Sequence, residues 1–192
     1  MVGAIAYGIV LGETHNSVRT PLDPLAIIRA YLGLISDRRF AVPTATVSLT
    51  IGALFSTFSA APRIFIEVLQ FTPIQLGLFF AGTVLIVFAA GMLATKLASR
   101  YGLQRSIRAG LWATAAGSVG ILLVSLFSPT ILPYLCAMCV FVLGMGIVSP
   151  LGTAQALSPF GDKAGAASAL LGFWQMMNAA AGVWLAGRHR VA

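Results

Sequence analysis

Residues 73–95 read PIQLGLFFAGTVLIVFAAGMLAT, a predominantly apolar stretch without an ionised side chain. Because an α-helix rises about 1.5 Å per residue, this stretch is long enough to cross the roughly 30 Å hydrocarbon core of a bilayer. Lipid offers no hydrogen-bond partners to the backbone, so such a stretch must be helical. Four more stretches have the same length and apolar character, at residues 40–62, 106–127, 130–151 and 164–187. The sequence therefore predicts an all-α integral membrane protein with five full transmembrane helices.

The composition leads to the same class of protein. The chain has 192 residues, of which 58% are hydrophobic and 9% are charged, whereas soluble domains carry about 25% charged residues. A soluble chain of this length could not enclose so much apolar surface in one core. The net charge of +7 does not indicate nucleic-acid binding, because the basic residues lie in short loops without a basic, aromatic-rich surface.

The distribution of Lys and Arg among the loops predicts how the chain is oriented. Nine of them fall in segments 12–39 and 96–108 and at Lys163, whereas the alternate loops contain only Arg63. Positive residues accumulate on the cytoplasmic side of membrane proteins. We therefore expect loops 12–39, 96–105 and 157–163 to be cytoplasmic in a multi-pass protein of the bacterial inner membrane.

The linker at 12–39 contains a predicted amphipathic helix. Asp23-Pro24 is a favourable helix start, with Asp as N-cap and Pro in the first helical position. An apolar stripe at helical spacing follows, and it consists of Leu25, Ile28, Tyr31, Leu32 and Ile35. Such a helix can lie on the membrane surface or pack on the protein as an ordinary linker, and the sequence leaves both alternatives open.

Small residues recur within the predicted spans, where they allow helix backbones to approach closely. They include Ala113, Gly117, Gly144, Gly146, Gly165, Ala169, Gly172, Ala179, Ala180 and Gly182. We expect close helix packing at these positions.

The turn between the second and third spans carries the most specific motif. Residues 91–105 read GMLATKLASRYGLQR, which resembles the G-x-L-a-D-r-x-G-r-k loop motif of the major facilitator superfamily. Gly91, Arg100, Gly102 and Arg105 match that motif or lie within one place of it. Ser99 stands where the family has Asp, and a serine cannot form the ion pair that an aspartate makes.

Other segments resemble the Bcr/CflA (bicyclomycin/chloramphenicol resistance) multidrug efflux branch of that superfamily. Residues 155–173, QALSPFGDKAGAASALLGF, are similar to the start of its helix 11, and residues 72–79, TPIQLGLF, to its helix 7–8 connection. The resemblance implies that the five spans are helices 7 to 11 of a C-terminal six-helix bundle. Residues 1–11 then correspond to the end of helix 6, and residues 188–192 to a truncated tail.

Polar and aromatic side chains inside the first and fifth spans are candidates for a substrate cavity. A site for amphipathic drugs requires aromatic walls and a few uncharged hydrogen-bonding groups, and transporter sites lie near the bilayer midplane. The candidates are Ser48, Phe55, Ser59, Trp174, Gln175 and Asn178. Each of them can instead serve in hydrogen bonding between helices.

Enzymatic and metal-binding functions are not indicated. Cys136 and Cys139 form a C-x-x-C, but a zinc site needs about four ligands, and no second Cys pair or nearby His accompanies them. We interpret them as buried apolar cysteines and expect no cofactor. No hydrolase, metalloprotease or phosphate-loop motif is present. The five acidic residues lie in loops or at helix ends, so a proton-coupling carboxylate is expected outside these spans.

The predicted function is transmembrane transport. By resemblance, an intact relative exports drugs by proton antiport, and this chain is a partial transporter whose partners are membrane lipid, a small amphipathic substrate and an N-terminal six-helix half. A second interpretation is a non-transporting membrane fragment or an assembly partner of a separately encoded first half. A third is a major facilitator transporter of another small solute.

Overall fold

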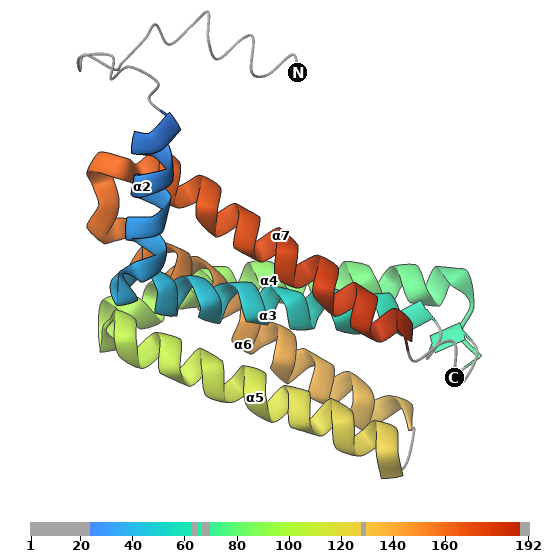
Figure 1. Ribbon diagram of the computed structural model, residues 1–192. Helices are drawn as coiled ribbons and strands as arrows, with labels where there is room; N and C mark the ends of the chain where they lie inside the picture. Colours follow the sequence, from blue (N-terminus) through green and yellow to red (C-terminus); the bar gives the residue numbers. More distant parts are fainter. Residues whose placement is uncertain (1–23, 63–64, 67–69, 128–129, 189–192) are drawn as a thin grey trace, which may run out of the picture.

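The computed structural model describes residues 24–62, 65–66, 70–127 and 130–188, and all elements in these ranges are helical (Figure 1). The predicted remnant at 1–11, the first half of the linker, Arg63 and residues 189–192 lie outside them. The elements are α2 (Pro24–Ser36), α3 (Arg38–Pro62), α4 (Pro73–Tyr101), α5 (Leu103–Phe127), α6 (Ile131–Leu157), the 3-10 helix η2 (Ser158–Lys163) and α7 (Ala164–Arg188).

Each of the five predicted spans corresponds to one of the helices α3 to α7, and only Thr130, the N-cap of α6, lies outside its helix. By length and composition, four continuous helical segments can cross a membrane, and the last runs for 57 residues from Ile131 to Gly187. That segment contains α6, η2 and α7, and the chain reverses direction at η2 (Figure 1). Since α6 has 27 residues and α7 has 25, each is about 40 Å long and sufficient for one crossing.

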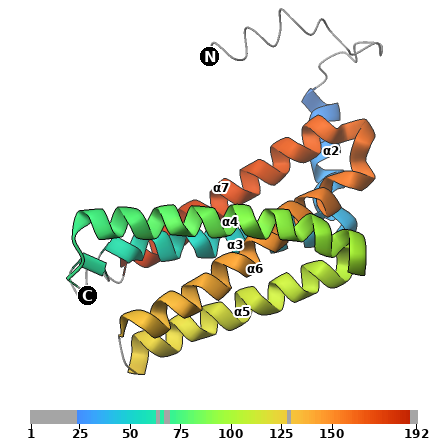
Figure 2. The same cartoon turned by 180° about the vertical axis from the view of Figure 1, so that it is seen from behind.

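Two helix pairs form the bundle. The most extensive contacts are those of α5 with α6 and of α3 with α7, and α6 also packs on α3 and α4. Helix α4 lies on the opposite side of the bundle from α7 (Figures 1 and 2). Helix α6 is therefore the central element, and its largest fully buried side chains are Met138, Phe141, Val142 and Val148.

Glycines make the closest approaches in both pairs. A Cβ atom added to Gly144 in α6 would lie 2.6 Å from Thr114 Oγ1 and 2.7 Å from the Gly110 carbonyl oxygen in α5. One added to Gly182 would contact the Gly52 carbonyl group. By contrast, Gly165 and Gly172 have open space at the Cβ position. The expected close packing therefore occurs at some of the small residues and not at others.

Helix α2 is described from Pro24 onward and runs across one end of the bundle, transverse to α3 (Figure 1). The predicted N-cap, Asp23, lies outside the described residues. The helix packs through Leu34, which is buried with Phe40, Leu170 and Leu171 from the first turns of α3 and α7. The predicted stripe is largely exposed, since Ile28, Leu32 and Ile35 are 53%, 58% and 44% exposed. Leu34, which the stripe omitted, is thus the main residue that fixes α2 to the bundle.

Candidate substrate-binding region

The face of α3 that meets α7 is lined with small and polar residues. Thr44, Ser48 and Gly52 recur every fourth residue, which places them on one side of the helix. A Cβ at Gly52 would lie 2.8 Å from the carbonyl oxygen of Asn178 in α7. The two helices therefore approach at backbone distance near the middle of both spans.

Two hydroxyl groups on this face lack a hydrogen-bond partner among the described residues. Thr44 Oγ1 and Ser48 Oγ are both buried, and Ser48 is 0% exposed. Most other hydroxyls in the spans donate to the carbonyl four residues earlier, as Thr114 Oγ1 does to Gly110 O at 2.9 Å. A buried hydroxyl without a partner costs about 1–3 kcal/mol. The α3 face therefore contains two buried hydroxyl groups, those of Thr44 and Ser48, whose hydrogen-bonding capacity is unsatisfied among the described residues.

The six cavity candidates occupy different environments. Ser48 is enclosed in the bundle and does not lie on an open surface, whereas Phe55 and Trp174 are 43% and 40% exposed. Ser59, Gln175 and Asn178 are partly exposed. The Asn178 side-chain amide donates to the Trp174 carbonyl at 2.9 Å, within its own helix. Trp174 and Thr44 line a pocket of about 180 Å³ near the α2 end of the bundle.

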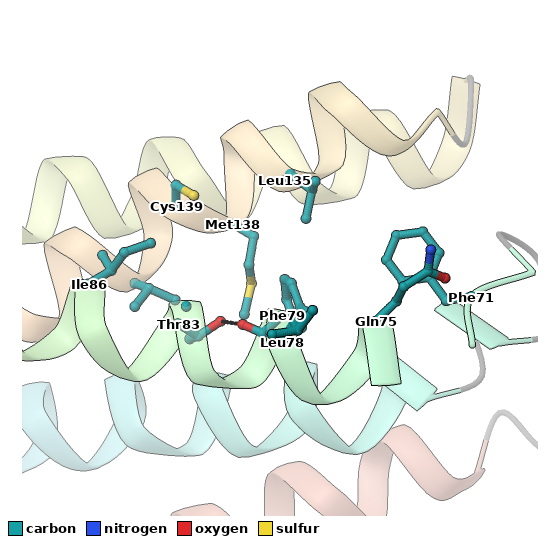
Figure 3. A pocket seen from close by; sticks show the side chains of 11 residues that line it. Phe71, Gln75, Leu78, Phe79, Thr83, Ile86, Leu135, Met138 and Cys139 are labelled. Atoms are coloured by element: carbon teal, nitrogen blue, oxygen red, sulfur yellow. Dashed lines mark hydrogen bonds between the residues drawn. The ribbon is translucent and has the colours of Figure 1, made fainter. Parts of the chain in front are cut away.

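A larger pocket lies between α4 and α6 (Figure 3), with a volume of about 420 Å³. Its polar groups are already engaged: Thr83 Oγ1 donates to Phe79 O at 2.9 Å, and Gln75 Oε1 accepts from the Thr72 amide at 2.9 Å. The pocket is thus almost wholly apolar. Its lining consists of Phe71, Gln75, Leu78, Phe79, Gly82, Thr83, Ile86, Leu135, Met138, Cys139 and Val142.

A second pocket of about 480 Å³ opens further along the same two helices. Beside this second pocket α4 and α6 touch closely, because a Cβ at Gly146 would lie 2.6 Å from Ala90 Cβ. The second pocket is lined by Val87, Phe88, Gly91, Met92, Thr95, Met145, Gly146, Ser149 and Pro150.

The sequence predicts cavity residues on α3 and α7, whereas the larger pockets lie between α4 and α6. The available signal was glycine: Gly82 and Gly91 have open space at their Cβ positions, and each lines one of the pockets. A glycine with open space at its Cβ position leaves a cavity, whereas a glycine against another helix allows close packing. The sequence alone does not show which of the two a given glycine does.

The loop motif forms the α4–α5 turn. Gly102 has φ = 85°, a conformation that glycine adopts without steric penalty. Its amide donates to Ala98 O at 3.0 Å and its carbonyl accepts from the Ser106 amide at 3.2 Å, so it closes α4 and begins α5. Arg100 lies over the Tyr101 ring at 5.6 Å. Ser99, at the family's acidic position, donates to Lys96 O at 2.9 Å within its own helix.

No metal site occurs among the described residues, since nowhere in these ranges do three potential ligands gather. Cys136 and Cys139 are free thiols on α6, and both are exposed, so the prediction that they are buried is wrong. No group of three potential metal ligands among the described residues includes them, so the C-x-x-C spacing has no further support as a metal site.

Comparison with known proteins agrees with this architecture. Residues 2–183 match the Major Facilitator Superfamily. The chain is also 24% identical over 176 residues to a bicyclomycin resistance protein homolog of Haemophilus influenzae. The alignment covers 90% of this chain and 44% of the relative, so the chain spans less than half the relative's length. This chain is a multi-pass helical bundle that matches the family over nearly the whole length of the chain. It therefore belongs to the major facilitator superfamily.

Proposed function

We propose that this chain acts as the C-terminal bundle of a drug efflux transporter in a bacterial cell membrane. The observation that carries the proposal is the family match over residues 2–183, together with the similarity to a bicyclomycin resistance protein homolog. The alignment with 44% of that relative supports a function that requires a second bundle. A complete site would then lie between two bundles that rock about it.

The substrate proposed is a small amphipathic molecule that is neutral or cationic. Apart from the ends of the helices, the described spans contain no Asp, Glu, Lys or Arg, so an anion would find no charged partner there. The α4–α6 pockets, of about 420 and 480 Å³, are within the usual size range for small-molecule sites. Phe55 on α3 and Trp174 and Gln175 on α7 are accessible side chains that would contact the substrate outside these two pockets, since α7 lies on the opposite side of the bundle from α4.

Proton coupling is the proposed driving force, and its ionisable group would come from the other bundle. A proton relay inside a membrane requires Asp, Glu or His, and the middle parts of α3 to α7 contain none. The distribution of positive charge supports an orientation in which loops 12–39, 96–105 and 157–163 face the cytoplasm.

Export is expected only when a first half is present. In a pump-deficient host, the chain alone should not lower the accumulation of a lipophilic fluorescent cation. Co-expression with the first six-helix half of a relative should give export that a protonophore abolishes. Export by the chain alone would refute the partial-transporter proposal. Complex formation without export of any compound in a chemically varied panel would favour the assembly-partner alternative, and export of polar solutes alone would favour another substrate class.

Filling the pockets is expected to reduce this export without destabilising the bundle. Gly82→Phe fills the first α4–α6 pocket and Gly91→Phe the second, and neither new Cβ meets an atom within 4 Å. We expect at least one of them to reduce the export rate about tenfold. Gly77→Phe is the matched control, because Gly77 also has open space and lines neither pocket. Equal export by all three variants, at equal amounts of folded protein, would exclude both pockets from the substrate path.

A further inference from the structure

A third pocket, of about 530 Å³, lies where α3 and α5 begin and α6 ends. Three arginines line it: Arg38 and Arg39 from the first turn of α3, and Arg108 from the second turn of α5. All three side chains are exposed. Its position at one end of three membrane-spanning helices puts it at the boundary between hydrocarbon and water.

The three guanidinium groups carry uncompensated charge. Within the described ranges, none of them forms an ion pair or a side-chain hydrogen bond. The neighbouring carboxylate, Asp37, is outside the lining, and its Oδ1 accepts from the Arg39 backbone amide at 2.8 Å at the start of α3. Asp162 also lies outside the lining. Three unpaired arginines around one hollow are a site for an anion, and guanidinium groups suit phosphate in particular.

The remaining walls distinguish a lipid from a free anion. The pocket is apolar behind the arginines, where Val42, Ile107 and Leu111 line it. Val42 is 60% exposed on the flank of α3, where the acyl chains of a bilayer lipid would run. A soluble phosphate would gain nothing from these side chains, whereas a phospholipid can bury its glycerol backbone and upper chains against them.

Polar groups on the opposite wall suit the hydroxyls of a glycerol headgroup. Gln155 Nε2 donates to Gln104 Oε1 at 3.0 Å. This bond leaves the two Gln104 amide hydrogens, one Gln155 amide hydrogen and lone pairs on both carbonyl oxygens available. Both glutamines line the pocket. The bond also ties the end of α6 to the start of α5, so that this wall is fixed before a ligand arrives.

We propose that this pocket binds the headgroup of an anionic phospholipid of the phosphatidylglycerol type. The lipid phosphate lies among Arg38, Arg39 and Arg108, the headgroup hydroxyls reach the Gln104–Gln155 pair, and the acyl chains leave along Val42 and Leu111. Bound in this way, the lipid bridges the α3–α7 pair and the α5–α6 pair at one end of the bundle. The proposal does not depend on which solute is transported.

The test measures lipid binding to the purified chain in detergent, by native mass spectrometry with titrated phosphatidylglycerol or phosphatidylcholine. The variant Arg38→Gln/Arg39→Gln/Arg108→Gln should bind phosphatidylglycerol about a hundredfold more weakly, since each basic residue near a lipid surface contributes roughly a fivefold factor. The matched control is Lys96→Gln/Arg100→Gln/Arg105→Gln, which removes the same charge from the same end of the bundle outside the pocket. It should change the affinity less than about threefold, the size of a screened long-range effect.

A second variant covers the case in which the triple substitution prevents folding. Gln155→Glu places a negative charge in the pocket with little change of shape, and it should weaken phosphatidylglycerol binding about fivefold. Equal losses in the pocket triple variant and its control, or equal affinity for the two lipids, would overturn the proposal. So would full competition by millimolar glycerol phosphate, because a soluble headgroup would then be the preferred ligand.

Discussion

Replacing Gly117 with leucine should separate α5 from α6 and produce the largest loss of stability of any single substitution proposed for this chain. A Cβ at residue 117 would lie 2.7 Å from Phe141 Cβ and would also meet the Phe141 backbone. A side chain can rotate away from a new neighbour, but a helix backbone cannot, so the whole of α5 must move. Overpacking costs about 1–3 kcal/mol or more, and we expect about 3 kcal/mol here.

The measurement is unfolding of the purified chain in mixed micelles with increasing SDS, followed by circular dichroism. Ala116→Leu is the control, because Ala116 is the neighbouring residue and its side chain is exposed. That variant should unfold at the same SDS fraction as the unmodified chain. If both variants behaved alike, the close contact of Gly117 with Phe141 would not exist in the folded protein.

Replacing Gly52 with leucine should open the α3–α7 interface. The new Cβ would lie 2.8 Å from the Asn178 carbonyl oxygen and 3.2 Å from Asn178 Cβ, and leucine adds three further carbons beyond it. Ser48, one turn earlier on the same face, is 0% exposed in the intact interface. Its position therefore reports whether α7 remains in place.

The reporter is a cysteine at residue 48, with Cys136 and Cys139 replaced by alanine, probed with a lipophilic maleimide. Gly52→Leu should increase the labelling rate at least about tenfold, because a penalty of about 1.4 kcal/mol changes the opening equilibrium by that factor. Ala53→Leu is the control, since Ala53 is adjacent and exposed. Unchanged labelling with Gly52→Leu would show that α7 does not pack against this face of α3.

The fold class could be predicted because lipid imposes a simple rule. Any stretch such as 73–95 must be helical in hydrocarbon, and five such stretches became five helices. The turn at Gly102 was also predictable, because its motif places a glycine where φ is positive.

The candidate site was less predictable because it depends on which helices are neighbours. Periodicity places Thr44, Ser48 and Gly52 on one face of α3, but it does not say whether that face meets water, substrate or another helix. The structure places Ser48 inside the bundle and opens the larger pockets between α4 and α6. The predicted stripe of α2 is a similar case, since the fully buried contact is Leu34, and of the stripe Tyr31 is only partly buried against the same cluster.

The sequence by itself determined that the chain crosses a membrane as a set of helices, where those helices lie, and which family they resemble. These properties follow from local apolarity, helix rise and short motifs. Only the tertiary structure decided that Gly117 and Gly52 meet backbone while Gly82 and Gly91 leave space, and that Arg38, Arg39 and Arg108 line one pocket. The reason is that the glycine contacts and the arginine-lined pocket both depend on which atoms of a neighbouring helix lie close by. A local sequence pattern does not specify those neighbours.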